Sequence, residues 1–468
     1  MSTGNWASAT TTGEFLAGRP EYTQDAAKVE AYRELATDWQ ATHGLVLRAP
    51  DAGSLLMAAP VSLGPSPIPR REFSRVVDLQ PRLNLLFERI SRDHGFLVDT
   101  LRSLGTADEF TARIFAMYMK QYELGIEKPG VVGIHRSDYL IHAPEGDTAA
   151  APRAKQVEFN TIAASFAALS AITGDLHRFL LARTGYQGLL ESGTIEPEQL
   201  PANESLTSIG DGIAAGFALY GSPEHGIAVE RLTFAEMLER GVIRDDNRLF
   251  VGDKEVAVAY YRSGYAPTDF STDAEWDGRW LIERSRAIPI PSLAYHLAGC
   301  KKIQQVLAQP GVVERFIDDQ EAAAQVRQCF VGLYPLDGSK EGLQACEMAI
   351  SDPDRYVVKP QREGGGYNTY GADIPRLLGQ LTEEERKGYI LMDLIRAPGF
   401  NSMLLRNGQL VPCEVVSELG IYGIFVSDRE GRTVVNRHGG HLLRTKASDV
   451  REGGVAAGFA VIDSPLLV

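Results

Sequence analysis

Residues 359–371 read Lys-Pro-Gln-Arg-Glu-Gly-Gly-Gly-Tyr-Asn-Thr-Tyr-Gly and follow an apolar run that predicts a strand over residues 356–359. Glycines have no Cβ, so the backbone N–H groups of Gly364, Gly365 and Gly366 can close on phosphate oxygens, and Lys359 adds a positive charge. Because the lysine precedes the glycines, neither the P-loop nor the dinucleotide spacing fits. A plain flexible loop is the alternative. The charged neighbours favour a nucleotide site in which Glu363 holds magnesium.

A second polar pattern, Glu158-Phe-Asn160, continues a predicted strand over residues 156–159. Side chains two positions apart share one face of a strand, and a carboxylate beside an amide oxygen suits a hard cation. Polar residues on an exposed strand face would give the same pattern. Residues 161–165 are expected to open an alanine-rich helix over 163–173, whose first amides could bind an anion.

Two cations, Arg444 and Lys446, lie on one side of the run 441–447 if that run is extended. The small-residue loop 453–458 follows and could lie close against a ligand. A solvated charged strand and a plain turn explain these segments equally well. Similarly, Arg136-Ser-Asp-Tyr139 could clamp a carboxylate or form a buried salt-bridged turn.

Around these motifs the chain predicts a mixed α+β / α/β fold. Apolar spacing predicts a helix from Asp25 to just before Gly44, further helices near 83–104 and 110–124, and two more between 291 and 328. The C-terminal part consists of β-branched or apolar runs, with a hairpin turn at 428–432, so we expect an antiparallel, sheet-rich unit there. The expected divisions are a mobile tail (1–20), an N-terminal body (21–205), a substrate domain (206–300) and a C-terminal nucleotide-binding unit (301–468).

The composition is that of a globular protein: 44% of the 468 residues are hydrophobic and 23% are charged. With 47 Lys and Arg against 61 Asp and Glu, the net charge is −14, and no run of five basic residues exists. We therefore expect no nucleic-acid partner and no membrane partner. Four scattered cysteines without C-x-x-C favour reduced thiols. The charge-free stretch 52–69 contains four prolines, which favours a loop or an edge segment over a membrane span. We expect a cytoplasmic protein.

Taken in order, these segments resemble the eukaryotic-type glutathione synthetases, which are ATP-grasp ligases. The resemblance runs from about Tyr32 to Val468. It is carried by Arg136-Ser-Asp-Tyr139, residues 158–166, Leu297-Ala-Gly-Cys-Lys-Lys302, residues 359–370, Ser417-Glu-Leu-Gly420 and residues 441–458. It implies an ATP-grasp fold and ATP-dependent joining of γ-glutamylcysteine to glycine through an acyl phosphate. It also implies a homodimer with two Mg²⁺ ions per subunit.

The resemblance also implies a role for each matching residue. Magnesium would be held by Glu158, Asn160 and Glu363. ATP would contact Lys301, Lys359, Glu363, Gly364, Gly365, Gly366, Asn368, Tyr370, Met392, Ile395, Glu418, Lys446 and Glu452. The peptide substrate would face Arg136, Ser165, Arg262, Tyr265, Arg444, Val455 and Ala456, and of these Arg136 and Arg444 are the candidates for stabilising the oxyanion. In the family, replacing the alanine pair goes with acceptance of β-alanine, so Ala456-Ala457 favours glycine.

The chain departs from the family at two places. Ala163 stands where the family usually has serine. Gly221-Ser-Pro223 runs almost directly into Arg231-Leu-Thr-Phe234, where relatives carry a strand–helix–strand segment that contacts γ-glutamylcysteine. Two other functions therefore stay open. One is an ATP-binding homologue with impaired or altered peptide use, regulatory or inactive, and the other is a ligase for another acceptor such as β-alanine.

Overall fold

The computed structural model describes residues 11–17, 25–49, 55–143, 149–183, 195–221, 227–361, 366–451, 453–455 and 458–468. The α-helices in these ranges are α1 (Thr12–Ala17), α2 (Ala26–Thr42), α3 (Arg70–Arg92), α4 (His94–Leu101), α5 (Glu109–Glu123), α6 (Ala167–Arg183), α7 (Ser205–Tyr220), α8 (Phe234–Arg240), α9 (Asp273–Glu283), α10 (Leu293–Ala298), α11 (Lys301–Leu307), α12 (Val312–Phe316), α13 (Gln320–Cys329), α14 (Lys340–Ser351), α15 (Asp373–Gln380) and α16 (Glu383–Arg386). In the described part of the chain, no helix is both long enough and apolar enough to span a bilayer.

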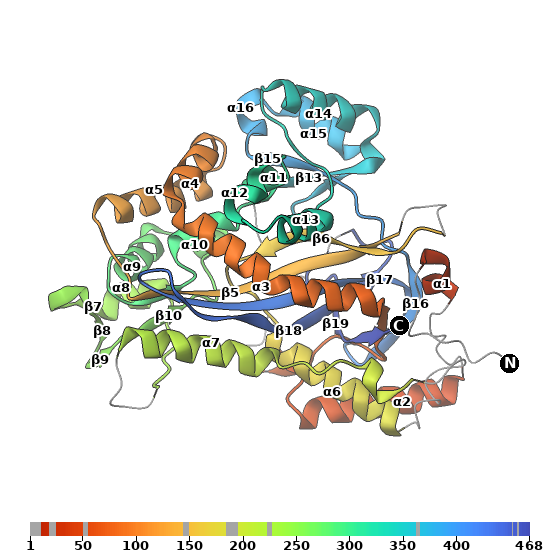
Figure 1. Cartoon of the computed structure of the whole chain (residues 1–468). Coiled ribbons are helices and arrows are strands. Elements are labelled where there is room, and N and C mark those ends of the chain that lie inside the picture. Colours follow the sequence, from red (N-terminus) through yellow and green to blue (C-terminus); the bar gives the residue numbers. More distant parts are fainter. Residues whose placement is uncertain are drawn as a thin grey trace.

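A seven-stranded sheet forms the centre of the molecule (Figure 1). Its strand order is β16 (Phe400–Arg406), β3 (Val61–Ser62), β19 (Val461–Asp463), β18 (Thr433–Ala447), β17 (Gln409–Asp428), β5 (Gly130–His142) and β6 (Arg153–Asn160). All neighbouring strands are antiparallel except β19 and β3, and β17 and β18 form the hairpin predicted at residues 428–432. The predicted C-terminal sheet is therefore confirmed.

Helices cover both faces of this sheet. On one face, Gly423 of β17 approaches α3 so closely that a Cβ would lie 2.0 Å from Asn84 Oδ1. The next residue, Ile424, points to the other face, where its side chain would meet a Cβ built on Gly212 of α7 at 2.8 Å. In Figure 1, α3 and α7 accordingly lie on opposite sides of the sheet, with α6 and α2 on the α7 side.

A smaller sheet lies above the large one in Figure 1. Its order is β12 (Leu333–Pro335), β15 (Tyr389–Asp393), β13 (Tyr356–Pro360) and β14 (Thr369–Tyr370). Successive residues of β13 point to opposite faces and belong to two different hydrophobic clusters. Val358 packs toward α14 and α15, whereas Val357 packs with Met392, Leu140 and Val157. Since Leu140 and Val157 belong to β5 and β6, the second face of this small sheet is turned toward the large sheet.

The remaining strands form small sheets. Within the region predicted as a substrate domain, β7 (Gly241–Ile243), β8 (Leu249–Val251) and β9 (Lys254–Glu255) make one sheet, and β10 (Val258–Tyr260) pairs in parallel with β11 (Ile288–Ile290). Elsewhere β1 (Val46–Arg48) pairs with β2 (Leu56–Ala58), and β4 (Ser66–Ile68) pairs with β20 (Pro465–Leu467). The domain boundaries near residues 205 and 300 stay predictions.

Several local predictions are confirmed and others are wrong. Helix α2 begins where predicted, because Asp25 caps it by accepting a hydrogen bond of 3.0 Å from the Ala27 N–H. The helix predicted near 83–104 is two helices separated at Asp93, and the two predicted between 291 and 328 are four. Part of the expected N-terminal tail, residues 12–17, is helix α1, in which Phe15 is buried. Residues 1–10 and 18–20 lie outside the described ranges.

The helix predicted from residue 163 begins only at Ala167. Ala163 and Phe166 have φ angles of 51° and 71°, which no α-helix accommodates. Residues 161–166 are therefore an irregular connection between β6 and α6, so the helix start predicted at residues 161–165 is wrong. Anion binding by this segment stays a prediction.

Candidate active site

Asp138 is the centre of a buried group of charges on β5. Its carboxylate is fully buried and accepts hydrogen bonds from Arg136 Nε at 2.7 Å and Nη2 at 2.9 Å. It also accepts one from Arg444 Nη2 at 3.0 Å, and Arg444 in turn contacts Glu418. The structure thus brings together both arginines that the resemblance implies as catalytic.

The close packing of this group depends on Gly420 of β17, which pairs with Asp138. A Cβ at Gly420 would lie 2.7 Å from Asp138 Oδ1 and 2.8 Å from Arg136 Cδ. Real Cβ atoms do not approach other atoms so closely, so only glycine leaves room for the ion pair.

Glu158 and Asn160 lie opposite Asp138 and Arg136 at the end of β6. Phe159 between them points to the other face, where its ring stacks on Phe87 with centroids 3.7 Å apart. The predicted shared face of Glu158 and Asn160 is therefore confirmed. The Nδ2 group of Asn160 donates a hydrogen bond of 3.0 Å to Asp138 Oδ2. The amide oxygen of Asn160 is therefore the atom that could bind a cation.

Two lysines flank this face. Lys301 Nζ lies 3.7 Å from Glu158 Oε2, and Lys359 Nζ donates to the Val157 carbonyl oxygen at 3.0 Å. Burial alone would raise the pKa of Glu158. The positive charges of these two lysines, of Arg444 and of Arg136 have a larger effect and hold that pKa well below its usual range. The Glu158 carboxylate is thus ionised at neutral pH. Together with Asn160 it fits the donor set that Mg²⁺ prefers.

Several predicted site residues lie outside the described ranges: Glu363, Gly364, Gly365, Glu452 and Ala456. The entry to the glycine-rich loop is described, because Gln361 Oε1 accepts a hydrogen bond of 3.1 Å from the Lys302 N–H. The loop therefore starts beside Lys301. Within the described residues, no group of three or more His, Cys, Asp or Glu side chains forms a metal site.

A cavity of about 650 Å³ lies where the small sheet faces the large one, and its lining includes Tyr370, Ile395 and Lys446 of the predicted ATP residues. Met392 is buried behind it, in one apolar cluster with Ile395 and Leu140. At the rim, Lys446 Nζ donates to the Arg451 carbonyl oxygen at 2.5 Å. Asn368 Nδ2 contacts the Tyr370 hydroxyl at 3.5 Å. An apolar cavity with a few polar groups suits a purine nucleoside.

Apart from Arg136 and Arg444 at Asp138, the described residues of the predicted peptide site lie in three places. Arg262 reaches the irregular connection after β6 and donates to Ser165 Oγ at 2.9 Å, while Tyr422 donates to the Ser165 carbonyl oxygen at 2.5 Å. Tyr265 lines a cavity of about 30 Å³ together with Lys301. Val455, by contrast, is buried in the main core.

The sequence analysis assigned no role of their own to two residues of the site, Asp138 and Tyr422. The signal for Asp138 was present, because an acid two positions after Arg136 on a strand lies on the same face. No pattern in the sequence indicated Tyr422.

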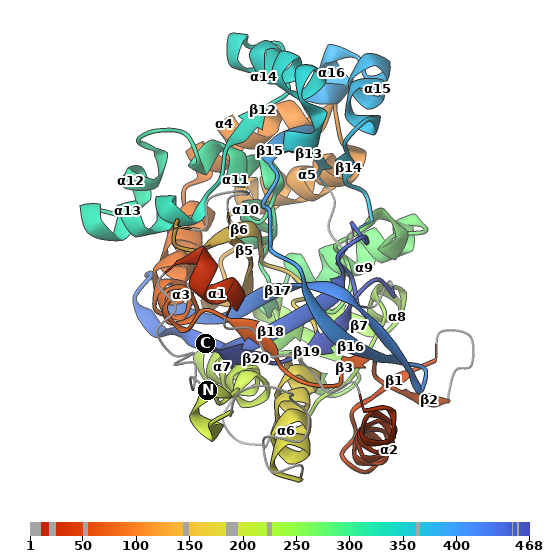
Figure 2. The ribbon, with the colours of Figure 1, turned by 90° about the vertical axis from the view of Figure 1, so that its right-hand side faces the viewer.

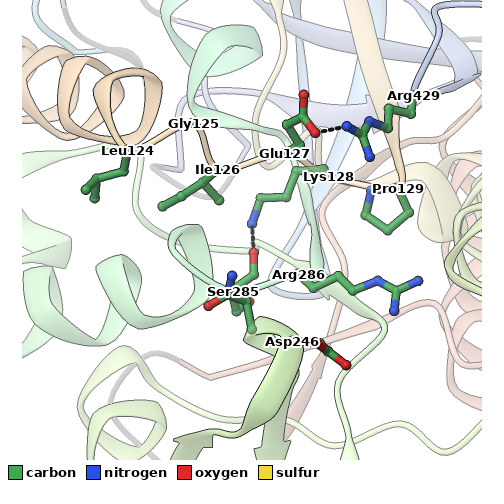
Figure 3. A pocket seen from close by; sticks show the side chains of 11 residues that line it. Leu124, Gly125, Ile126, Glu127, Lys128, Pro129, Asp246, Ser285, Arg286 and Arg429 are labelled. Atoms are coloured by element: carbon green, nitrogen blue, oxygen red, sulfur yellow. Dashed lines mark hydrogen bonds and ion pairs between the residues drawn. The ribbon is translucent and has the colours of Figure 1, made fainter.

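A separate cavity of about 400 Å³ lies beside residues 124–129 (Figure 3). It is lined by none of the predicted site residues. Its cations already have partners: Lys128 Nζ donates to the Ser285 carbonyl oxygen at 2.5 Å, and Arg429 contacts Glu127. Burial lowers the pKa of Lys128 to about 8. This cavity therefore carries no part of the site described above.

Known proteins resemble the chain over nearly its whole length. Glutathione synthetase from Homo sapiens is 38% identical, over 94% of this chain and 98% of the relative. The Xenopus laevis protein of the same name is 37% identical, over 95% and 98%. A glutathione synthetase-like effector from Globodera pallida, solved in its apo form, has a TM-score of 0.74 with 24% identity over 95% of this chain and 98% of that one. This last likeness concerns the fold, and it confirms the predicted mixed fold.

The alignment with the human protein spans 476 positions but includes only 94% of the 468 residues here, so parts of the relative have no counterpart in this chain. Residues 222–226 lie outside the described ranges, and the shortened segment expected after Gly221 stays a prediction. The family model for the eukaryotic glutathione synthase, ATP-binding domain, matches residues 26–467. The chain therefore belongs to the eukaryotic glutathione synthase family.

Proposed function

We propose that this glutathione synthase joins γ-glutamylcysteine to glycine at the expense of ATP, through an acyl phosphate. One observation supports this most directly. Glu158 and Asn160, with the ammonium groups of Lys301 and Lys359, lie at the edge of the large sheet that faces the small one. The apolar cavity lies between the same two sheets. The nucleoside would bind in that cavity and the phosphates would reach the charged residues.

The charged residues suit phosphoryl transfer. Glu158, Asn160 and Glu363 would hold Mg²⁺, which, when bound, would neutralise charge on the phosphates. Lys301 and Lys359 would add positive charge around the transferring phosphoryl group. In phosphoryl transfer the protein contributes mainly positioning and electrostatic stabilisation. The ionised state of Glu158 at neutral pH supports its proposed role as a ligand.

The reaction would proceed in two steps. A cysteinyl carboxylate oxygen attacks the γ-phosphorus of ATP, so that ADP leaves and an acyl phosphate forms. The amine of glycine then attacks the acyl carbon, a proton leaves the nitrogen, and inorganic phosphate departs with the oxygen that attacked. Arg136 and Arg444 would stabilise the oxyanion of this second step, because the Asp138 carboxylate fixes both guanidinium groups.

Three further properties follow from the family resemblance and belong to the proposal: a homodimer, two Mg²⁺ ions per subunit, and a cytoplasmic location. The alanine pair Ala456-Ala457 supports glycine as the acceptor. The peptide-contacting segment that we expect to be missing after Gly221 keeps the regulatory or inactive homologue as a second candidate function.

Coupled detection of ADP, with substrates omitted one at a time, tests the proposal. A ligase forms ADP only when γ-glutamylcysteine and an acceptor amine are both present, and glycine should be used better than β-alanine. Nucleotide binding without turnover would support the second candidate, and faster turnover with β-alanine would show a different acceptor.

A further inference from the structure

We propose that helix α1 forms part of the nucleotide site and that the hydroxyl group of Thr12 binds the nucleoside part of ATP. This inference rests on the proposed function, since it requires ATP in the cavity between the two sheets. It adds to the site a residue from outside the span matched by the family model, which begins at residue 26.

Thr12 lines the same cavity as Ile395 and Lys446. The chain segments that meet there are far apart in sequence. Figures 1 and 2 show α1 beside β17, the strand that contributes Val416 to the cavity lining. Through Thr12, helix α1 therefore forms part of the wall of this cavity.

Two contacts hold α1 in this position, and a capping interaction stabilises its first turn. The Thr12 N–H donates to the Ala150 carbonyl oxygen at 2.7 Å, which ties the helix to the segment before β6. Phe15 is only 4% exposed and belongs to the main hydrophobic core. Thr11 and Glu14 exchange reciprocal side-chain-to-backbone hydrogen bonds of 3.1 Å, the arrangement that stabilises a helix start.

The hydroxyl group of Thr12 is buried and unsatisfied. Thr12 is 3% exposed, and its Oγ1 has no hydrogen-bond partner among the described residues. A buried hydroxyl without a partner costs free energy, so such groups normally have one. Because Thr12 lines the cavity, a bound ligand that comes within reach of this hydroxyl can supply the partner.

The lining of the cavity indicates which part of the nucleotide Thr12 meets. The residues around it are largely apolar, among them Leu140, Ala143, Leu394 and Pro398. The lining also contains the charged residues Asp354, Arg396, Lys446 and Arg451. The residues proposed to act on magnesium and the transferring phosphate, Glu158 with Lys301 and Lys359, are absent from it. A hydroxyl can both donate and accept a hydrogen bond, so it can pair with polar atoms of the base or the ribose.

The test compares Thr12→Val, which keeps the shape and removes the hydroxyl, with Thr12→Ser, which keeps the hydroxyl. Dissociation constants for ATP, ADP and inorganic tripolyphosphate are measured by calorimetry on the full chain. Thr12→Val should bind ATP and ADP about 3- to 10-fold more weakly than the wild type, the worth of one hydrogen bond. Tripolyphosphate binding should be unchanged. Thr12→Ser should stay within about twofold of the wild type for all three ligands.

Thermal unfolding of the free proteins is the second measurement. Thr12→Val should be at least as stable as the wild type without nucleotide, since it removes an unsatisfied buried hydroxyl. Unchanged ATP affinity in Thr12→Val, or an equal loss for ATP and tripolyphosphate, would overturn this inference and leave the proposed function intact. Failure of the wild type to bind ATP would overturn the proposed function and this inference with it.

Discussion

Arg444 of β18 donates a hydrogen bond of 3.0 Å to the carboxylate of Asp138 on β5, although β17 lies between the two strands. Arg136 binds the same carboxylate from its own strand. The two guanidinium groups are thus fixed relative to each other before any substrate binds. Such pre-organised positive charge is what stabilisation of an oxyanion requires.

Replacing Asp138 tests this arrangement. In Asp138→Asn the buried Arg136 loses its anionic partner and Arg444 keeps only Glu418, so we expect a loss of about 3 kcal/mol in unfolding free energy. We also expect a larger fall in kcat than in ATP affinity. Asp428→Asn, on the same sheet with the exposed partner Arg432, is the control and should change the unfolding free energy far less. Equal effects of the two substitutions would contradict the assignment of Asp138.

The close approach at Gly420 gives a second prediction. Gly420→Ala places a methyl group against Asp138 and Arg136, and we expect about 1–3 kcal/mol of destabilisation with a loss of activity. A Cβ added at Gly210 of α7 would meet no neighbouring atom within 4 Å, so Gly210→Ala should be neutral or stabilising. The measurement is chemical denaturation of both variants. A Gly420→Ala protein as stable as the wild type would show that there is room for a methyl group between Gly420 and Asp138.

Glu158 gives a prediction about pH. Because its pKa is lower in the folded protein than the ordinary 4.5, ionised Glu158 stabilises the fold above about pH 4.5, and this contribution disappears as the pH falls through the lower, folded-state pKa. The stability difference between wild type and Glu158→Gln should therefore be constant above about pH 5 and shrink only in stronger acid. A difference that changes between neutral pH and pH 5 would mean that Glu158 titrates there.

Arg262 is expected to position the peptide substrate through Ser165. We predict that Arg262→Ala raises KM for γ-glutamylcysteine about tenfold and leaves KM for ATP unchanged. Arg262→Lys should be intermediate, because lysine keeps the charge but cannot donate to Ser165 and Ala164 in the same geometry. Steady-state kinetics with each substrate varied distinguishes these cases. Equal changes in both KM values would point to a general structural effect.

The sequence predicted those parts of the site that depend on local pattern. Strand periodicity correctly placed Glu158 and Asn160 on one face, and turn residues correctly predicted the hairpin between β17 and β18. The meeting of Asp138 with Arg444 depends on strand order, which no local pattern contains. The false helix at residue 163 has a similar cause, because Arg262 and Tyr422 bind the Ser165 region in an irregular conformation that overrides the helix preference of alanine.

The central claim is that this site activates the cysteinyl carboxylate as an acyl phosphate. Labelling both oxygens of that carboxylate with ¹⁸O, and analysing the products by mass spectrometry, tests it directly. The account predicts that each glutathione formed is accompanied by one inorganic phosphate carrying a single ¹⁸O atom. Glutathione formation with unlabelled phosphate, or ADP release without glutathione, would contradict it.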